Sequence, residues 1–281
     1  MKTGEIVYLP RWRPGGSRVG AHRSRDAGGL GTFRDQVSFL RLPDARRIDI
    51  RATLRDPFEG TYVRRFETRT AIEVWALVDL SASMRFEGEA SRAELVADLC
   101  MGLADSATRI GDAFGLIGCD DRIREDVVLP ATRQRGLATE RAAGLTEVDF
   151  RGGSARGLVD AATRLAGRPK LIFVISDFRW PEPLIEEVFS GLALHDVVPV
   201  LLADRAEDEN LPSFGLMEFD DLEGGGRRMV FMRPSLRRRW HARERARLDT
   251  LRRIASAYGR PPFRLEGRFD AEALSRHLMA T

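Results

Sequence analysis

The chain has 281 residues, of which 43% are apolar and 31% charged, so it is long and apolar enough to bury a sizeable core, and a disordered tail is excluded. The 45 basic residues nearly balance the 42 acidic ones, and the formal net charge of +3 by itself indicates no particular partner. The charges are segregated, however. Residues 1–70 carry 15 basic and 8 acidic side chains, residues 71–226 carry 15 and 29, and residues 227–268 carry 14 and 3.

Hydropathy and cysteine content predict a soluble, cytoplasmic protein. The longest apolar run, residues 197–203, is far shorter than the roughly 20 residues that a membrane-spanning helix needs. The polar first residues have no signal-peptide core. Cys100 and Cys119 lie in apolar segments without neighbouring histidines, which favours buried reduced thiols over a zinc site or a disulfide framework.

The first predicted segment comprises residues 1–70. Residues 1–45 are rich in glycine, arginine and proline, and we predict an irregular arm there. From residue 48 to residue 70 the pattern becomes strand-like, with a strand at 61–66 after a turn at Asp56-Pro57. The segment is therefore predicted to be an Arg/Gly-rich arm with a small β subdomain.

Residues 71–205 show short apolar runs alternating with helical patterns, which is typical of βαβ units on a mostly parallel sheet. The run at 74–78 has no polar alternation, as a strand covered on both faces requires. The helix that follows starts with capping-box spacing at Ser91 and Glu94 and ends at Gly111. Further strands are predicted at 114–119, 123–129, 171–176 and 197–203, and further helices at 154–165 and 184–194.

Beyond Asp204 the alternation stops, and residues 206–281 are predicted to pack on the sheet as an extension. Residues 220–226 indicate a hairpin tip that leads into a strand at 229–231. The helix after Pro234 has an apolar side and a dense arginine face, and Gly259 ends it.

The most informative motif is Asp79-x-Ser81-x-Ser83, directly after the first core strand. Open α/β sheets bind ligands at the carboxyl ends of their strands. Hydroxyl and carboxylate oxygens suit hard divalent cations, and Mg²⁺ in particular keeps several of its waters. Asp177, which ends the strand at 171–176, and Ser154, at the start of a helix, could supply further oxygens. Because parallel neighbouring strands end at one edge of a sheet, we expect these side chains to converge there.

The Asp-x-Ser-x-Ser loop, the Gly-Gly-Ser turn at 152–154 and the strand ending in Ser176-Asp177 resemble the metal-ion-dependent adhesion site of von Willebrand factor A domains. More narrowly, nearly the whole chain resembles the bacterial family named domain of unknown function 58, which accompanies MoxR-type AAA+ ATPases. This narrower resemblance rests on five segments in one order: His22-Arg23-Ser24, Arg46 to Ala52, Tyr62 to Glu67, Asp79 to Met84, and Ser176-Asp177-Phe178.

The resemblance implies a von Willebrand factor A-like α/β fold, with Asp79, Ser81, Ser83, Ser154 and Asp177 at the metal-site positions. The hydroxyls would bind the ion (Mg²⁺, or else Mn²⁺ or Ca²⁺) directly, the two carboxylates mainly through water, and a partner's carboxylate would take the sixth position. This chain departs from the family pattern at Ser154, where Thr is usual, at Ile50, where Trp is typical, and at Thr32, where Glu is frequent.

The same residues also allow a purely structural interpretation, since Asp and Ser after a strand are ordinary turn and N-cap residues. Two carboxylates buried together without a cation, however, would cost several kcal/mol or force one of them to hold a proton. Ser81 occupies the position where a haloacid-dehalogenase phosphatase needs its second Asp. The chain also has no nucleophile elbow, phosphate loop or dinucleotide fingerprint, and its four histidines lack metal-ligand spacing.

The sequence thus predicts a non-enzymatic, metal-dependent adaptor that works with a MoxR-type ATPase and binds an acidic residue of a protein client. The family resemblance suggests the assembly or maturation of methanol dehydrogenase or another metalloenzyme. The alternative is a nucleic-acid or anionic-surface binding protein that uses its Arg-rich flanks, with Arg237-Arg238-Arg239 on a positive helix face. The acidic middle of the chain offers those arginines an internal partner, and no motif for reading bases is present, so we place nucleic-acid binding second.

Overall fold

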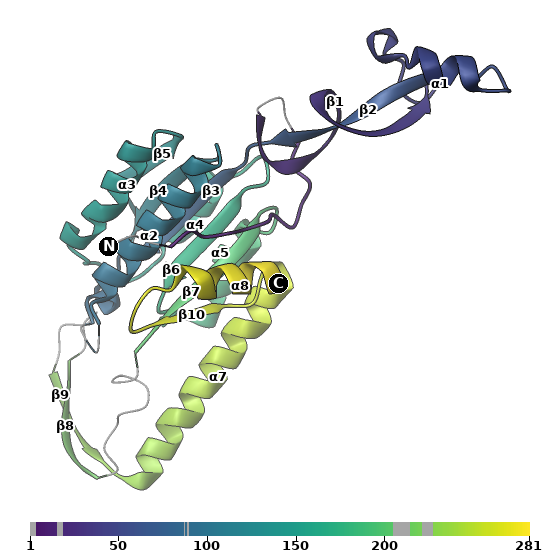
Figure 1. Cartoon of the computed structure of the whole chain (residues 1–281). Helices are drawn as coiled ribbons and strands as arrows, with labels where there is room; N and C mark the ends of the chain where they lie inside the picture. The colour runs from purple at the N-terminus through teal and green to yellow at the C-terminus, as the bar shows by residue number, and fades with distance from the viewer. Residues whose placement is uncertain (1–3, 16–18, 87, 89, 205–213, 221–226) are drawn as a thin grey trace. The chain divides into compact units, whose positions relative to one another are not determined.

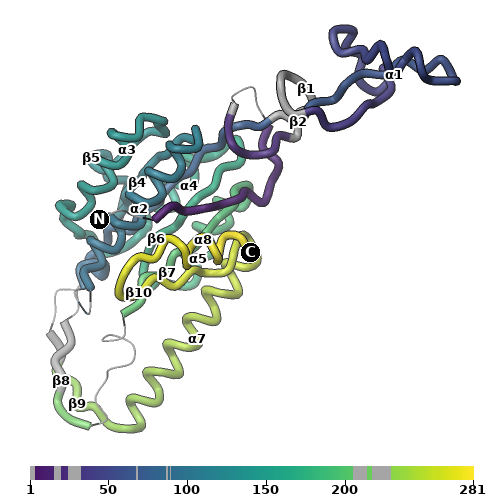
Figure 2. The backbone as a smooth tube through the Cα atoms, viewed as in Figure 1, coloured from purple at the N-terminus to yellow at the C-terminus, as the bar shows by residue number. Residues whose placement is uncertain are grey.

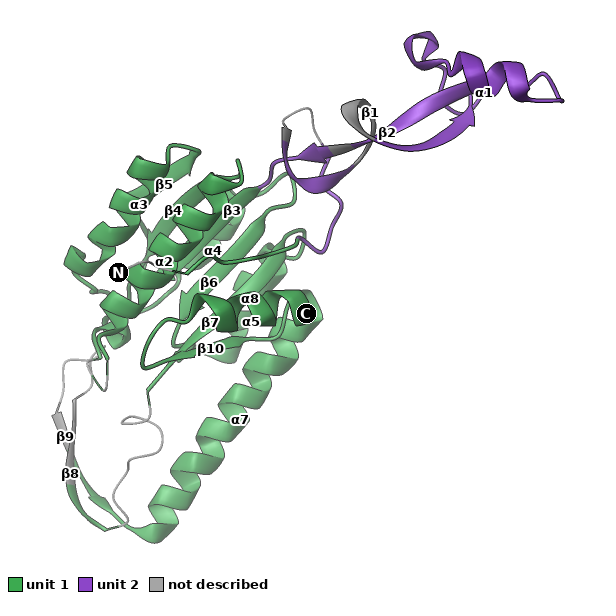
Figure 3. Cartoon of the chain, viewed as in Figure 1, with its two compact units in different colours: residues 1–9, 73–281 green, residues 10–72 purple. Residues whose placement is uncertain are grey.

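The computed structural model describes residues 4–15, 19–86, 88, 90–204, 214–220 and 227–281. The chain forms two compact units (Figure 3). Unit 1 comprises Met1–Leu9 and Glu73–Thr281, and unit 2 comprises Pro10–Ile72. Among the described residues, no helix is long and apolar enough to cross a membrane.

Unit 1 is built on a six-stranded sheet with the order β10-β7-β6-β3-β4-β5 (Figure 1). All neighbouring strands are parallel except β5, which runs antiparallel to β4. The α/β fold class with a mostly parallel sheet is thereby confirmed. The strands are β3 (Glu73–Asp79), β4 (Ala113–Cys119), β5 (Ile123–Thr132), β6 (Leu171–Ser176), β7 (Asp196–Ala203) and β10 (Phe263–Glu266).

Helices cover both faces of this sheet (Figure 2). On one face α2 (Arg92–Arg109) packs beside α3 (Arg135–Ala143) and against β4. On the other face, residues of α4 (Gly157–Arg164), α5 (Glu182–Gly191) and the C-terminal half of α7 (Pro234–Tyr258) share one apolar cluster with Trp75, Leu77 and Ile172. The four central strands, β3, β4, β6 and β7, are therefore buried on both faces, as the run at 74–78 predicted for the first of them.

Local sequence accounts for the ends of α2. Ser91 has an extended backbone, and its hydroxyl accepts the N–H of Glu94 at 3.4 Å, as the capping-box spacing predicted. Leu95, Leu99 and Leu103 form the buried stripe of the helix. Gly111, with a φ of 88°, follows its end. The helix predicted from residue 154 begins only at Gly157, so Ser154 lies in the preceding loop.

The C-terminal segment completes the sheet rather than only covering it. β10 pairs in parallel with β7, and α8 (Ala271–Ala280) follows it. Arg260, which is 1% exposed, donates to both carboxylate oxygens of Asp196 at 2.8 Å and also bonds the carbonyls of Leu9 and Leu278. One buried guanidinium thus joins β7, the C-terminal helix and the N-terminal segment of unit 1.

A further hairpin, β8 (Gly215–Asp220) and β9 (Arg227–Met232), precedes α7. The strand predicted at 229–231 lies within β9. Most of the predicted hairpin tip, residues 221–226, lies outside the described residues.

Unit 2 is built on an antiparallel pair, β1 (Val19–Ser38) and β2 (Tyr62–Thr70), with a 3-10 turn η1 (Ala45–Arg47) and a short helix α1 (Ile50–Arg55). The prediction of an irregular arm is wrong for residues 19–38. Pairing with β2 supplies hydrogen bonds to this stretch, and register shifts, one of them between Ala27 and Thr32, accommodate its glycines. Asp49 caps α1, and its hydrogen bond from Arg64 holds the pKa of the Asp49 carboxyl below its usual value.

Candidate functional site

The candidate site begins with Asp79, the last residue of β3, whose side chain is fully buried. Its Oδ1 accepts the backbone N–H of Ser81 at 2.9 Å. Its Oδ2 accepts the hydroxyl of Ser176 at 2.6 Å and the indole N–H of Trp180 at 2.9 Å. Three donors therefore fix the carboxylate where the strand ends, and the sequence pattern indicated neither Trp180 nor Ser176 as a partner.

The two serines of the motif lie beside this carboxylate. The Oγ atoms of Ser81 and Ser83 are 3.1 Å apart. Ser81 is the N-cap of the 3-10 turn η2 (Ala82–Arg85) and is buried, whereas Ser83 is partly exposed. The turn thus brings two hydroxyl oxygens together, as the Asp-x-Ser-x-Ser spacing predicted.

Asp177 directly follows the adjacent strand β6, and its carboxylate is 2% exposed. Its Oδ1 accepts the N–H of Arg179 at 3.0 Å, and its Oδ2 accepts a guanidinium N–H of Arg92 at 3.1 Å. Burial raises the pKa of the Asp79 carboxyl, and the negative charge of Asp177 raises it further. The two carboxylates therefore act on one another at the same edge of the sheet.

Ser154 is differently placed from what the sequence predicted. Its hydroxyl donates to Oδ1 of Asp121 at 2.8 Å, and the N–H of Gly153 donates to Oδ2 of the same carboxylate at 3.1 Å. The loop itself adjoins the motif, because the N–H of Ala82 donates to the carbonyl of Gly152 at 3.1 Å. The structure therefore brings the two loops together but directs the Ser154 hydroxyl to Asp121, a residue that the sequence reasoning treated only as part of a turn.

Arg92 is the most important residue that the sequence reasoning missed. It is the first residue of α2, its side chain is 3% exposed, and Nη1 donates to the carbonyl of Ser83 at 2.8 Å as well as to Asp177. Its guanidinium carbon lies 5.0 Å from the ring centroid of Phe86, which is within the range of a cation–π contact. One signal in the sequence could have pointed to Arg92. It is a basic residue in the first turn of a helix, where the helix dipole disfavours a cation, so its position there calls for a nearby negative charge.

The turn after Asp177 is held from α7. Phe178 has a φ of 51°, a left-handed conformation that is rare for a bulky residue and needs support from its surroundings. Nη1 of Arg247 donates to the carbonyls of Asp177 and Phe178 at 2.8 and 3.0 Å. Phe178 is itself buried and packs on Trp180, with ring centroids 5.0 Å apart. Arg247 and this aromatic pair thus fix the backbone that carries Asp177.

In donor chemistry these residues fit a hard divalent cation. Asp79, Ser81, Ser83 and Asp177 supply carboxylate and hydroxyl oxygens at one sheet edge. Burial first and the charge of Asp177 second raise the pKa of the Asp79 carboxyl, and a cation would favour its ionised form. Within the described part of the chain, no three acidic, histidine or cysteine side chains gather to hold a metal ion. A metal at this site would therefore depend on the serine hydroxyls and on water.

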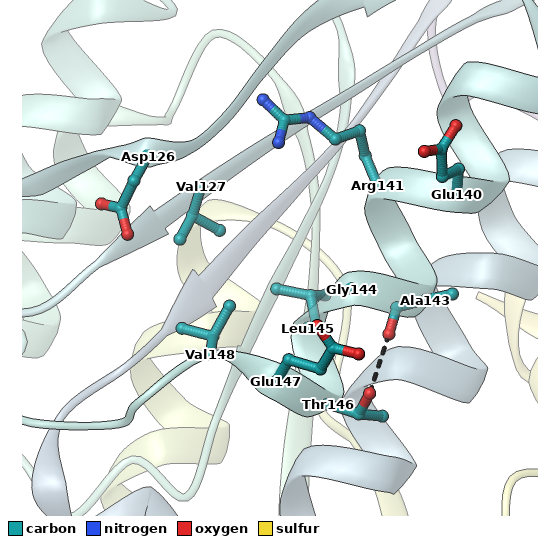
Figure 4. Close-up of a pocket in the computed structure, with 10 residues that line it drawn as sticks. All are labelled: Asp126, Val127, Glu140, Arg141, Ala143, Gly144, Leu145, Thr146, Glu147 and Val148. Carbon is teal, nitrogen blue, oxygen red and sulfur yellow. Dashed lines mark hydrogen bonds between the residues drawn. The ribbon is translucent and has the colours of Figure 1, made fainter.

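A separate cavity of about 560 Å³ lies between β5, α3 and the turn η3 (Gly144–Glu147), and it shares no residue with the site above (Figure 4). Its lining mixes Asp126, Glu140, Arg141 and Glu147 with apolar residues such as Val127. Asp126 is bound by Arg124 through two hydrogen bonds. Charged groups around this cavity are thus partly neutralised within the protein.

The fold and the site define the class of this protein, an α/β domain with an acidic and hydroxylic loop at the carboxyl ends of parallel strands. The protein family described as "Protein of unknown function DUF58" matches residues 43–249, and the chain belongs to this family. The family predicted from the sequence is thereby confirmed over residues 43–249, which contain four of the five segments, and the mostly parallel six-stranded sheet agrees with the expected α/β fold. No curated protein matches the chain.

Three solved structures illustrate the likeness. The conserved hypothetical protein BatB from Bacteroides thetaiotaomicron is 17% identical, with a TM-score of 0.48 over 75% of this chain and 98% of that one. An aerotolerance-related membrane protein from Bacteroides fragilis NCTC 9343 is 16% identical, with a TM-score of 0.44 over 75% and 100%. The SpRpn10 VWA domain is 12% identical, with a TM-score of 0.39 over 75% and 96%.

Proposed function

We propose that this protein is a non-enzymatic adaptor that binds an acidic group of a protein partner at the Asp79 site through a divalent cation, with Mg²⁺ as the first candidate. The observation that carries the proposal is the pair of hydroxyls 3.1 Å apart beside two interacting carboxylates. Asp79, Ser81, Ser83 and Asp177 would hold the ion. When bound, the ion supplies a positive charge with an open coordination position that attracts a carboxylate.

The surroundings of the site support binding rather than acid–base chemistry. The Ser81 hydroxyl is paired with that of Ser83. His195 accepts a backbone N–H from Lys170, His241 bonds Arg237, and His277 bonds the carbonyl of Pro261, so each of these histidines is engaged elsewhere. A general base for serine activation needs hydrogen-bond reach of the hydroxyl.

The proposed partner is a MoxR-type AAA+ ATPase, together with a client protein that supplies the acidic residue. This part of the proposal comes from the family, whose members accompany such ATPases, and the client would be methanol dehydrogenase or another metalloenzyme under assembly. Because the ATPase needs ATP, we place the complex in the cytoplasm, and cell fractionation tests that placement.

The test is recovery of a MoxR-type ATPase from the same organism, and of the client, on the immobilised full chain with Mg²⁺ or with EDTA. We expect EDTA or Asp79→Ala to reduce recovery about tenfold or more, because losing either the cation or its carboxylate removes the attraction for the partner's acidic group. Asp249→Ala is the matched control, since Asp249 is 72% exposed on α7 and pairs with Arg252, three residues along the same helix.

Added Mg²⁺ should restore recovery after EDTA for the wild type and for Asp249→Ala but not for Asp79→Ala. Equal recovery of the partners under all of these conditions would refute a metal-dependent mechanism.

The second candidate function is binding of a nucleic acid or another polyanion, and one observation favours it. Arg238, Arg239 and Arg243 are exposed on the first half of α7. Farther along the helix, Arg247 bonds Glu244 and Arg253 bonds Glu182 of α5, so acidic groups of this chain already engage these two arginines. Gel shifts with duplex DNA that weaken steeply with salt and ignore EDTA would favour this second function.

A further inference from the structure

Arg92 places a buried positive charge inside the proposed cation site. Nη1 of Arg92 lies 3.1 Å from Oδ2 of Asp177 and 2.8 Å from the carbonyl oxygen of Ser83. Both members of the Arg92 and Asp177 pair are at most 3% exposed, so solvent screens their interaction little. The guanidinium thus donates to the side chain of one proposed metal ligand, Asp177, and to the backbone carbonyl of another, Ser83.

The position of Arg92 is not explained by the helix that carries it. At the first turn of α2 a cation faces the positive end of the helix dipole, which is unfavourable. Among the described residues, Asp177, the Ser83 carbonyl and the ring of Phe86 nevertheless contact the guanidinium there. The neighbouring carboxylates are what make a buried cation favourable at this place.

We infer that Arg92 is a counter-cation built into the site, which competes with the divalent ion for Asp177 and thereby sets the affinity of the site for metal. This inference rests on the proposed function in so far as the site takes a divalent cation. Asp79 and Asp177 present two negative charges when ionised, and Arg92 offsets one of them. An ion that uses Oδ2 of Asp177 competes with the guanidinium for this oxygen and also meets its repulsion.

The inference predicts that removing the charge of Arg92 tightens metal binding. Isothermal titration of the full chain with MnCl₂ and MgCl₂ would compare the wild type with Arg92→Gln, Arg92→Lys and Arg109→Gln. Arg92→Lys keeps the charge. Arg109, at the opposite end of α2, pairs with Asp105 and Glu5 and serves as the control. We expect Arg92→Gln to bind Mn²⁺ about tenfold or more tightly than the wild type, because one nearby unit charge shifts an equilibrium by this order.

Far-UV circular dichroism in EDTA establishes that each variant is folded. If Arg92→Gln does not fold, NMR of the arginine side-chain N–H groups in the wild type gives an independent readout. The Arg92 signal, assigned through Arg92→Lys, should shift when Mg²⁺ is added, and the Arg109 signal should not. An Arg92 signal that is unchanged at saturating Mg²⁺ would overturn the inference.

The titration separates this inference from the proposed function. If the wild type binds Mn²⁺ and Arg92→Gln binds it no more tightly, the inference fails and the metal-dependent function stands. If only Arg92→Gln binds the ion, the inference holds and metal-dependent binding by the wild type fails. If neither binds the ion, both are wrong.

Discussion

Replacing Arg260 with leucine should cost unit 1 a large part of its stability. Arg260 and Asp196 are each about 1% exposed, and the guanidinium donates to both carboxylate oxygens and to the carbonyls of Leu9 and Leu278. Arg260→Leu leaves the Asp196 carboxylate buried without this cation. Removing one partner of a buried ion pair costs about 3–5 kcal/mol. For a domain of this size that lowers the melting temperature by roughly 6–20 °C.

Urea unfolding followed by far-UV circular dichroism and tryptophan fluorescence measures this cost. The control is Arg253→Leu, because Arg253 and Glu182 pair across α7 and α5 with side chains 61% and 52% exposed. An exposed pair of this kind contributes about 1 kcal/mol or less. Adding Asp196→Asn to Arg260→Leu should recover part of the loss, since it removes the buried negative charge that Arg260 neutralises in the wild type. If Arg260→Leu and Arg253→Leu cost the same, the interpretation of Arg260 as the link between β7, the C-terminal helix and the N-terminal segment is wrong.

Two further predictions concern the space around two glycines and the ionisation of Asp79. Gly157→Ala should destabilise unit 1 by about 1–3 kcal/mol, because a Cβ there would lie 2.4 Å from the carbonyl carbon of Arg122. Gly144→Ala, with open space around its Cβ and a helical φ of −61°, should instead stabilise by about 0.4–1 kcal/mol, and thermal unfolding distinguishes the two variants. The pKa of Asp79 is raised in the folded state, by burial first and by Asp177 second, so its protonated form is the one that folding favours. In EDTA, the free energy of unfolding of the wild type, measured relative to Asp79→Asn, should therefore fall as the pH rises from 3.8, the ordinary pKa of an aspartate, through the raised pKa of Asp79 in the folded protein. A difference between the two proteins that grows with pH would contradict this account.

The central part of the fold could be predicted because its signals are local. The strand at Val74 is apolar without alternation, which requires cover on both faces, and the spacing of Ser91 and Glu94 marks the start of a helix. The proximity of Asp79 and Asp177 was predictable for a related reason. Each ends a parallel strand, and β3 and β6 are neighbours in the sheet.

The parts of the fold that escaped prediction have weak local signals. β10 has only four residues and alternates charged with apolar side chains, so nothing in its sequence distinguishes it from a loop. Its place is decided by pairing with β7 and by the buried Arg260. β1 contains glycines that break any strand pattern, and its register against β2 fixes it as a strand. In both cases the hydrogen-bond partner lies far away along the chain.

At the candidate site, the sequence by itself determined which oxygen atoms are available, because the Asp-x-Ser-x-Ser loop and the strand ending in Asp177 are contiguous motifs. Only the tertiary structure decided how those oxygens are used. It turns Ser154 toward Asp121, gives Asp79 a third donor in Trp180, and brings Arg92 to Asp177. These outcomes depend on charges and donors that meet across separate elements, and the balance between a bound cation and a buried guanidinium is set by distances that no local pattern encodes.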